Sequence, residues 1–231
     1  MSKNKKTFVC SLPIVLFYLI KKRLDAKKPV PYPKALGYKN VKYNWSDMIA
    51  GTDSYQGVAI LMYEIGLPKN ADSDYGIGWI GAGNASTSTN RDKSKKAYKN
   101  MGFDNPGNFK KYETSGVKSS INNGDPVQVA GNSKIKKYIL WIPIYETGHS
   151  WVIDGYKQVT IMVKDKATGI KKKKLTLDYV HCNLGWGEYN CNGWYFSGVF
   201  DTDNIPEPTR SAKSDNYYRY NIEMLTGIKP E

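Results

Sequence analysis

The pattern of apolar and polar positions divides the chain into a helical first part and a β-rich second part. Residues 54–66 place Val58, Leu61, Met62 and Ile65 at i, i+3, i+4 and i+7, which predicts one amphipathic helix with its apolar side in the core. Residues 91–101 predict a second, short and basic helix. A glycine- and serine-rich loop over 72–90 separates the two and is expected to line a substrate site.

The second part has the pattern of a meandering antiparallel sheet. From residue 126 onward, short runs of aliphatic and aromatic residues are separated by Gly, Asn or Asp turns. The predicted strands are 126–131, 137–145, 149–156, 158–163, 174–184, 193–200 and 218–225. Residues 164–174, KDKATGIKKKK, predict the tip of an exposed hairpin. Helices first and an antiparallel sheet second indicate an α+β fold with segregated parts.

The N-terminal segment allows three interpretations. MSKNKK is followed by TFVCSLPIVLFYLI, a basic stretch before an apolar one, which has the shape of a signal peptide. No small-x-small cleavage site follows, and the apolar run is shorter than the roughly 20 residues of a membrane span. An uncleaved anchor, a buried N-terminal helix and the start of a truncated gene all fit. Residues 28–37 contain Pro29, Pro31 and Pro33 and predict an extended connector.

Charge and cysteine content narrow the classes of partner. The formal net charge is +13, which suits nucleic acid, anionic membranes or acidic glycans. No zinc-finger spacing, aromatic RNA-binding strand or helix-turn-helix pattern is present, so we expect no nucleic-acid partner. Cys182 and Cys191 fit either a disulfide in an export compartment or two free buried thiols. With three cysteines and two histidines, we expect no metal site and no cofactor.

The two histidines limit the candidate chemistry. His149 begins a predicted strand after Gly148, and His181 lies inside YVHCNLGWGEYNCNGWYF. A Cys–His–Asn arrangement requires an imidazole near a thiolate and a third group that orients the ring. Asn183 is an available orienting amide, and Trp186 would shield the pair from water. By spacing alone, a lone histidine at the start of a strand is more often a structural residue than a catalytic one.

Two motifs add a family resemblance. GHSWVIDGY followed by HCNLGWGEYNCNGWYFSGVF resembles the C-terminal half of the streptopain family of papain-like cysteine peptidases. YNWSDM, AILMYEIG, DSDYGIGWIGAG, NGDPVQVAG and the closing GIKP resemble further family segments in the same order. The resemblance covers roughly residues 43–230. It implies a papain-like fold, with an N-terminal helical lobe, a C-terminal antiparallel β lobe and the active-site cleft between them.

The resemblance also implies site residues. His149 matches the catalytic histidine, Asn183 the asparagine that orients the ring, and Trp186 the second tryptophan of the Trp-Gly motif in the cleft wall. Leu184 and Glu188 replace a family Trp and Gly and would reshape that wall.

The nucleophile segment departs from the family pattern. The family has its cysteine in a G-C-[VA] stretch that opens a helix, about fifteen residues before a Tyr-Pro. Counting back from Tyr32-Pro33, this chain has Tyr18 there. Cys10 is the only upstream thiol and is the tentative nucleophile; Cys182 is a worse candidate because it shares a sheet with His149. We therefore expect a divergent or N-terminally truncated member, with residues 1–28 as a degenerate nucleophile helix or anchor-like segment and 29–231 as the peptidase domain.

The expected function is a cysteine-type endopeptidase acting on protein or peptide substrates. A homologue without the nucleophile is the main alternative, and a basic surface adhesin or a related amidase are further ones. The resemblance implies a secreted or cell-surface bacterial protein, and we expect a monomer. The N-terminal segment leaves membrane anchoring open.

Overall fold

The structure is a computed structural model in which residues 11–27, 43–50, 56–75, 87–103, 106–164, 166–185, 191–202, 207–208 and 217–228 are described. Five helices lie within these ranges. They are α1 (Ser11–Asp25), α2 (Trp45–Ala50), α3 (Gln56–Gly66), α4 (Arg91–Asn100) and α5 (Thr114–Asn122). The two helices predicted over 54–66 and 91–101 are confirmed as α3 and α4. Leu61 and Ile65 of the predicted apolar side are fully buried, and the Asn90 side chain caps α4 by accepting a hydrogen bond from the Lys93 N–H.

The main sheet is antiparallel and seven-stranded, in the order β3-β11-β4-β5-β6-β7-β9. Its strands are β3 (Lys110–Lys111), β4 (Val127–Ile139), β5 (Ile142–Lys164), β6 (Lys171–Asn183), β7 (Gly193–Phe196), β9 (Glu207–Pro208) and β11 (Tyr220–Leu225). Two small pairs, β1 (Asp74–Tyr75) with β2 (Thr87–Ser88) and β8 (Phe200–Asp201) with β10 (Tyr217–Tyr218), complete the structure. The α+β prediction is confirmed, and the arrangement is compatible with a papain-like fold.

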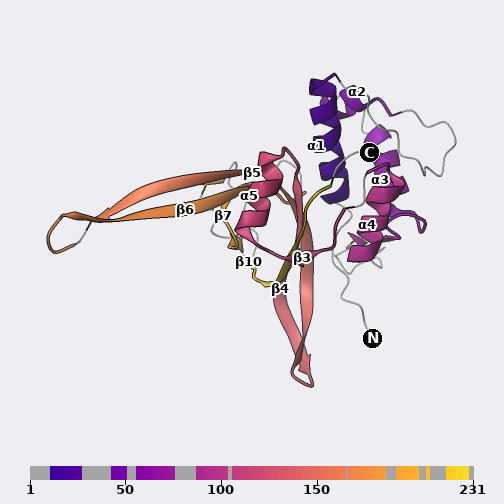
Figure 1. Cartoon of the computed structure of the whole chain (residues 1–231). Helices are drawn as coiled ribbons and strands as arrows, with labels where there is room; N and C mark the ends of the chain where they lie inside the picture. The colour runs from indigo at the N-terminus through magenta and orange to yellow at the C-terminus, as the bar shows by residue number, and fades with distance from the viewer. Residues whose placement is uncertain are drawn as a thin grey trace.

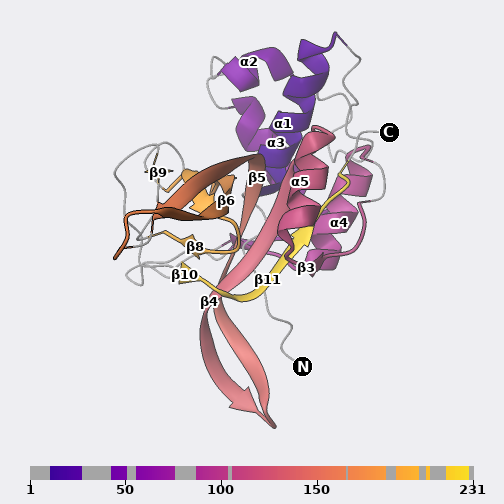
Figure 2. The same cartoon turned by 60° about the vertical axis from the view of Figure 1, so that its left-hand side comes forward.

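Strand β5 is long enough to belong to two hairpins. Its first part pairs with β4 and its last part with β6. Both hairpins extend beyond the helices, and they leave the sheet in different directions, one downward and one to the left in Figure 1. Figure 2 shows the same divergence after rotation. The second hairpin ends between Lys164 and Lys171, so the tip predicted over 164–174 is confirmed.

The strand predicted over 137–145 is wrong, because the chain turns back inside it. Ile139 pairs with Ile142 across a two-residue turn made by Leu140 and Trp141. Both turn residues have positive φ angles, 46° and 68°. Turns of this kind normally carry Asn or Gly, so an apolar run without either gave no sign of the turn. Residues 142–147 instead begin β5, which also contains the strands predicted over 149–156 and 158–163.

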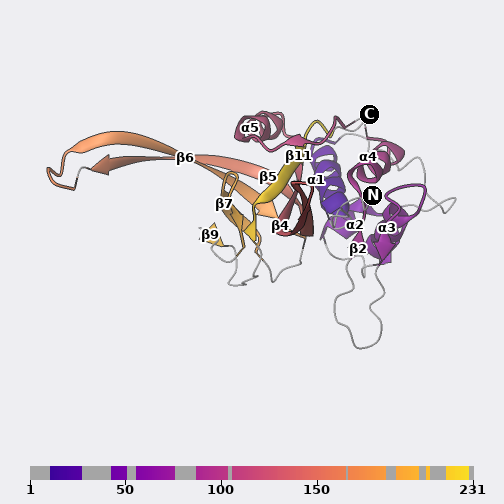
Figure 3. The ribbon, with the colours of Figure 1, turned by 90° about the horizontal axis from the view of Figure 1, so that it is seen from below.

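Buried apolar residues form two clusters on either side of the sheet. The first lies between helices α1–α4 and the sheet and receives Val152 and Leu225 from the strands. The second lies on the opposite side and includes Trp151 and Ile153 from β5 and Val117 from α5. Figure 3 shows α1–α4 gathered together, with α5 standing apart from them. Because successive residues of β5 alternate between the clusters, His149 shares the side of Trp151.

Helix α1 is part of the core, as the interpretation of a buried N-terminal helix expects. Val15, Leu19 and Ile20 are buried in the first cluster. The Lys22 ammonium donates to the carbonyl oxygens of Gly124, at 2.6 Å, and Asn123, at 3.2 Å. It also lies 3.6 Å from the Asp125 carboxylate. These contacts fasten the end of α1 to the corner between α5 and β4.

None of the helices in the described part of the chain is long and apolar enough to cross a membrane.

Candidate active site

His149 lies in β5 opposite Gly131 of β4 and is 5% exposed. Its Nε2 atom is 2.8 Å from the carbonyl oxygen of Leu184. A carbonyl oxygen only accepts hydrogen bonds, so Nε2 carries the proton and donates it. In the neutral ring the lone pair then belongs to Nδ1. This contact therefore leaves Nδ1 as the atom through which His149 would accept a proton.

Aromatic rings enclose the imidazole. The Trp151 ring lies at 6.4 Å and 16° from it, and the Tyr218 ring at 5.6 Å and 30°, both between centroids. Burial lowers the pKa of His149 to about 4, an effect that the Leu184 carbonyl partly opposes. The ring is consequently neutral at pH 7, which is the state that a general base requires.

Two asparagines hold the backbone on both sides of Leu184, whose carbonyl contacts His149. Asn192 Oδ1 accepts a hydrogen bond from the Leu184 N–H at 2.8 Å. Asn183 Oδ1 accepts one from the Gly185 N–H at 3.0 Å. Gly185 has a φ of 75°, so the chain bends sharply just after the Leu184 carbonyl. The asparagine amides thus fix the direction of the oxygen to which the imidazole donates.

The predicted site residues have different outcomes. His149 and Asn183 belong to the same corner of the sheet, but the contact described for the Asn183 amide is to the Gly185 backbone. Its predicted action on the ring itself stays a prediction. Cys10 and Trp186 lie outside the described residues. Sequence reasoning missed Asn192, and the only signal for it was its place in the Asn- and Gly-rich turn before β7.

The other two cysteines are free thiols and are buried. This outcome selects the second of the two alternatives for Cys182 and Cys191. Burial raises the pKa of the Cys182 thiol well above its usual value, and the nearby Asp154 carboxylate adds to the increase. A thiol in this state carries almost no thiolate at neutral pH, so Cys182 is unsuited to be a nucleophile.

The second histidine forms a pair that spacing did not predict. His181 Nδ1 lies 2.6 Å from Asp154 Oδ1, and both side chains are about one quarter exposed. The register of β5 and β6 shifts between Ile153 and Gly155, which leaves Asp154 without a partner in the ladder. Such bulges redirect side chains. Burial raises the pKa of Tyr18 in α1, and the Asp154 carboxylate adds to the increase.

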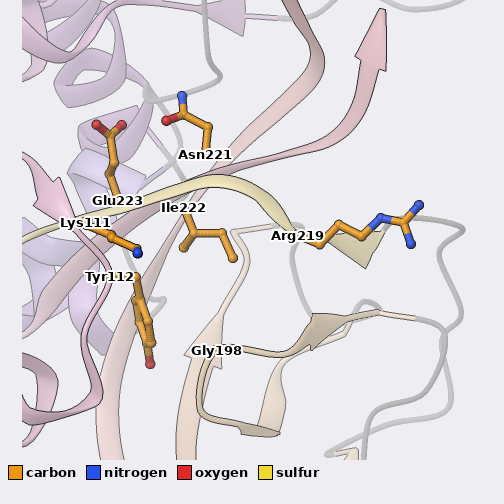
Figure 4. Close-up of a pocket in the computed structure, with 7 residues that line it drawn as sticks. All are labelled: Lys111, Tyr112, Gly198, Arg219, Asn221, Ile222 and Glu223. Carbon is orange, nitrogen blue, oxygen red and sulfur yellow. The ribbon is translucent and has the colours of Figure 1, made fainter. Parts of the chain in front are cut away.

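A separate pocket of about 550 Å³ lies beside β11 (Figure 4). Its walls are Lys111, Tyr112, Gly198, Arg219, Asn221, Ile222 and Glu223. In Figure 4, Tyr112 and Ile222 point to one side of β11 and Asn221 and Glu223 to the other. These seven residues include no imidazole, thiol or aliphatic hydroxyl. We therefore assign the candidate chemistry to the corner around His149.

Comparison with known proteins identifies the family of the chain. The profile of the peptidase C10 family, the streptopain family of cysteine peptidases, matches residues 20–195. The matched range contains His149, Asn183 and Asn192, whereas Cys10 precedes it. No curated protein sequence matches the chain. Since the profile covers more than half of the sequence and the motifs around His149 lie within it, the chain belongs to the peptidase C10 family.

Proposed function

We propose that the protein is a cysteine-type endopeptidase in which His149 is the general base and Cys10 is the nucleophile. Membership of a cysteine peptidase family supports the reaction class. The observation that carries the choice of base is the contact from His149 Nε2 to the Leu184 carbonyl, because it leaves the lone pair on Nδ1.

The proposed reaction proceeds through a thioester. His149 Nδ1 takes the proton from the Cys10 thiol, and the thiolate sulfur attacks the carbonyl carbon of the scissile peptide bond. The carbon–nitrogen bond then breaks as the imidazolium gives its proton to the leaving amine. Water, deprotonated by His149, attacks the thioester and releases the acid product, and Cys10 recovers its proton.

The N-terminal charge of α1 supports Cys10 as the nucleophile, although α1 packs against the side of the sheet opposite to the His149 ring. The helix begins at Ser11, the residue after Cys10. A helix N-terminus has a partial positive charge that favours a thiolate. The core contacts of Val15, Leu19 and Ile20, together with the Lys22 contacts, hold this helix against the sheet. The proposal therefore places the thiol at the start of a helix that is fixed to the sheet containing His149.

One observation favours the alternative of a homologue without a nucleophile. His149 is 5% exposed, and burial lowers its pKa to about 4. Both properties are also those of a structural histidine that stacks between aromatic rings.

An adhesin would need neither the neutral imidazole nor a thiol, and its binding to anionic glycans would be insensitive to His149→Ala.

Casein hydrolysis by single variants separates these readings. We expect Cys10→Ser and His149→Ala to abolish thiol-dependent cleavage. Cys191→Ser is the matched control, because it makes the same change at a buried thiol that has no part in the proposed reaction, and it should retain activity. Full activity of Cys10→Ser would refute the assignment of the nucleophile.

Labelling with an epoxide inhibitor of cysteine peptidases provides a second test. We expect stoichiometric modification of Cys10, which peptide mass spectrometry would locate, and its loss in His149→Ala. Absence of labelling in folded protein would instead support the homologue without a nucleophile. We further propose that the enzyme acts outside the cell or on its surface, which fractionation of the producing bacterium would test.

A further inference from the structure

The hairpin formed by β4 and β5 ends in five consecutive exposed apolar residues, 138–142, which we call the hairpin tip. The exposed fractions are 62% for Tyr138, 48% for Ile139, 86% for Leu140, 94% for Trp141 and 67% for Ile142. Figures 1 and 2 show that this hairpin projects well away from the helices and the rest of the sheet. Such a concentration of apolar surface on a projecting element marks an interaction site.

Formation of the turn does not explain the residue types at the tip. Leu140 and Trp141 both have positive φ, a conformation that disfavours residues with a Cβ atom. Asn-Gly would form the same two-residue turn with less strain. The chain thus accepts both strain and exposed apolar area at one point, and a binding role accounts for the two together.

Lysines surround the tip on the strand that leads to it. Lys134, Lys136 and Lys137 lie in β4, and Lys134 and Lys137 pair with residues of β5. The sequence has no Asp or Glu between Asp125 and Glu146. Glu146 lies opposite Lys134 in the ladder, and the hairpin is basic from Lys136 to its end. This order matches an anionic membrane. The apolar end would meet the acyl chains, and the lysines behind it would meet the negative headgroups.

We propose that the hairpin tip inserts into the surface of anionic lipid bilayers and docks the protein there. Trp and Tyr favour the interface between headgroups and acyl chains, and the long lysine side chains reach the phosphate level. The tip is convex and projects, which suits a deformable lipid surface. A folded protein partner would need a complementary groove. This inference does not depend on the chemistry proposed for Cys10 and His149.

The second hairpin offers an internal comparison. It also carries many lysines, including Lys164, Lys166 and Lys174. Its end is less apolar than the hairpin tip: Ala167, Thr168 and Gly169 precede Ile170, which is 60% exposed, and no aromatic residue is present. If charge alone caused binding, the two hairpins would contribute equally. If insertion of a continuous apolar tip with aromatic side chains is needed, the hairpin tip would contribute most of the binding.

Cosedimentation of the full chain with vesicles tests the proposal. We expect binding to vesicles of 30% phosphatidylglycerol in phosphatidylcholine and little binding to phosphatidylcholine alone. The double substitution Leu140→Asn/Trp141→Gly installs the residues that the turn prefers, so the hairpin should remain folded. It should weaken binding roughly 100-fold, because two large apolar side chains are lost.

Lysine variants separate local from general electrostatics. Lys134→Gln/Lys136→Gln/Lys137→Gln should weaken binding roughly fivefold per lysine. The matched control Lys164→Gln/Lys166→Gln/Lys174→Gln removes the same charge from the other hairpin and should leave most of the binding intact. Equal losses in both triple variants would contradict specific docking through the hairpin tip.

A spectroscopic measurement locates the contact. Brominated lipids should quench the fluorescence of bound protein, and Trp141→Phe should keep binding while losing most of that quenching. Unchanged vesicle binding after Leu140→Asn/Trp141→Gly would overturn the proposal. A second outcome would also overturn it: the wild type does not bind vesicles but forms an oligomer in sedimentation velocity, and the double variant is a monomer. The tip would then contact a second copy of the chain.

Discussion

His149 and Leu184 are 35 residues apart, yet the His149 Nε2 atom lies 2.8 Å from the Leu184 carbonyl oxygen. The histidine comes from β5, and the carbonyl follows the end of β6. A backbone acceptor cannot be removed by changing a side chain, so the tautomer of His149 is built into the sheet. The predictions below examine this contact and the packing that supports it.

The buried imidazole makes stability depend on pH. The pKa of His149 is about 4 in the folded protein and near 6.5 when unfolded. Below pH 6.5 the unfolded chain binds a proton that the folded chain does not. Stability is therefore complete above about pH 6.5 and declines as the pH falls toward 4. Between pH 7.5 and 4.5 this group should contribute a loss of about 2 to 3 kcal/mol.

Urea unfolding of the wild type and of His149→Gln at both pH values measures this contribution. The glutamine amide can donate to the Leu184 carbonyl but does not titrate. Carboxylates contribute equally in the two proteins and cancel in the comparison. If the free energy of unfolding changes with pH in the same way in both proteins, the pKa of His149 is not lowered by folding.

Asn192 should act on catalysis through the Leu184 peptide. Asn192→Ala removes the acceptor of the Leu184 N–H and lets the neighbouring carbonyl shift. Because small misplacements of a catalytic group are costly, we expect kcat/KM for peptide cleavage to fall about 10- to 100-fold. Asn192→Asp keeps an oxygen acceptor and should retain more activity. Equal losses of activity in the two variants would argue against this role. So would an unchanged pKa of His149 in both variants.

Gly131 leaves room for the Trp151 ring that stacks on His149. A Cβ atom at this position would lie 3.1 Å from Trp151 Cη2 and 3.5 Å from Ile222 Cγ1. Since Trp151 is fully buried, Gly131→Ala should lower the free energy of unfolding by about 1 to 3 kcal/mol. Gly107→Ala is the control, because no atom lies within 4 Å of the added methyl group. In denaturant unfolding, the free energy of unfolding of Gly107→Ala should be close to that of the wild type.

Tyr43 stabilises a buried carboxylate in the helical core. Its hydroxyl donates to Glu64 Oε2 at 2.7 Å, and burial together with Glu64 raises the pKa of Tyr43. Tyr43→Phe removes a hydrogen bond to a charged group and should cost about 1.5 to 3 kcal/mol of stability. Tyr138→Phe makes the same chemical change at an exposed site and should have almost no effect on thermal unfolding. Similar melting temperatures for both variants would contradict this.

Features that depend on local periodicity could be predicted. Helix α3 follows the spacing of its apolar residues, and most strands follow runs of β-favouring residues. The turn at Leu140 and Trp141 could not, because neither residue has a propensity for that conformation. The pair of Asp154 and His181 escaped as well, since it depends on a bulge that no periodicity reveals.

The sequence by itself determined the α+β class, the family and the identity of His149 as the candidate base, because these rest on apolar periodicity and on contiguous motifs. Only the tertiary structure decided which ring nitrogen is protonated, that Asn192 accepts a hydrogen bond from the Leu184 N–H, and that the tip at 138–142 is exposed. Each of these depends on residues far apart in the chain, brought together by strand register and turn geometry. Local sequence carries no direct record of such pairings.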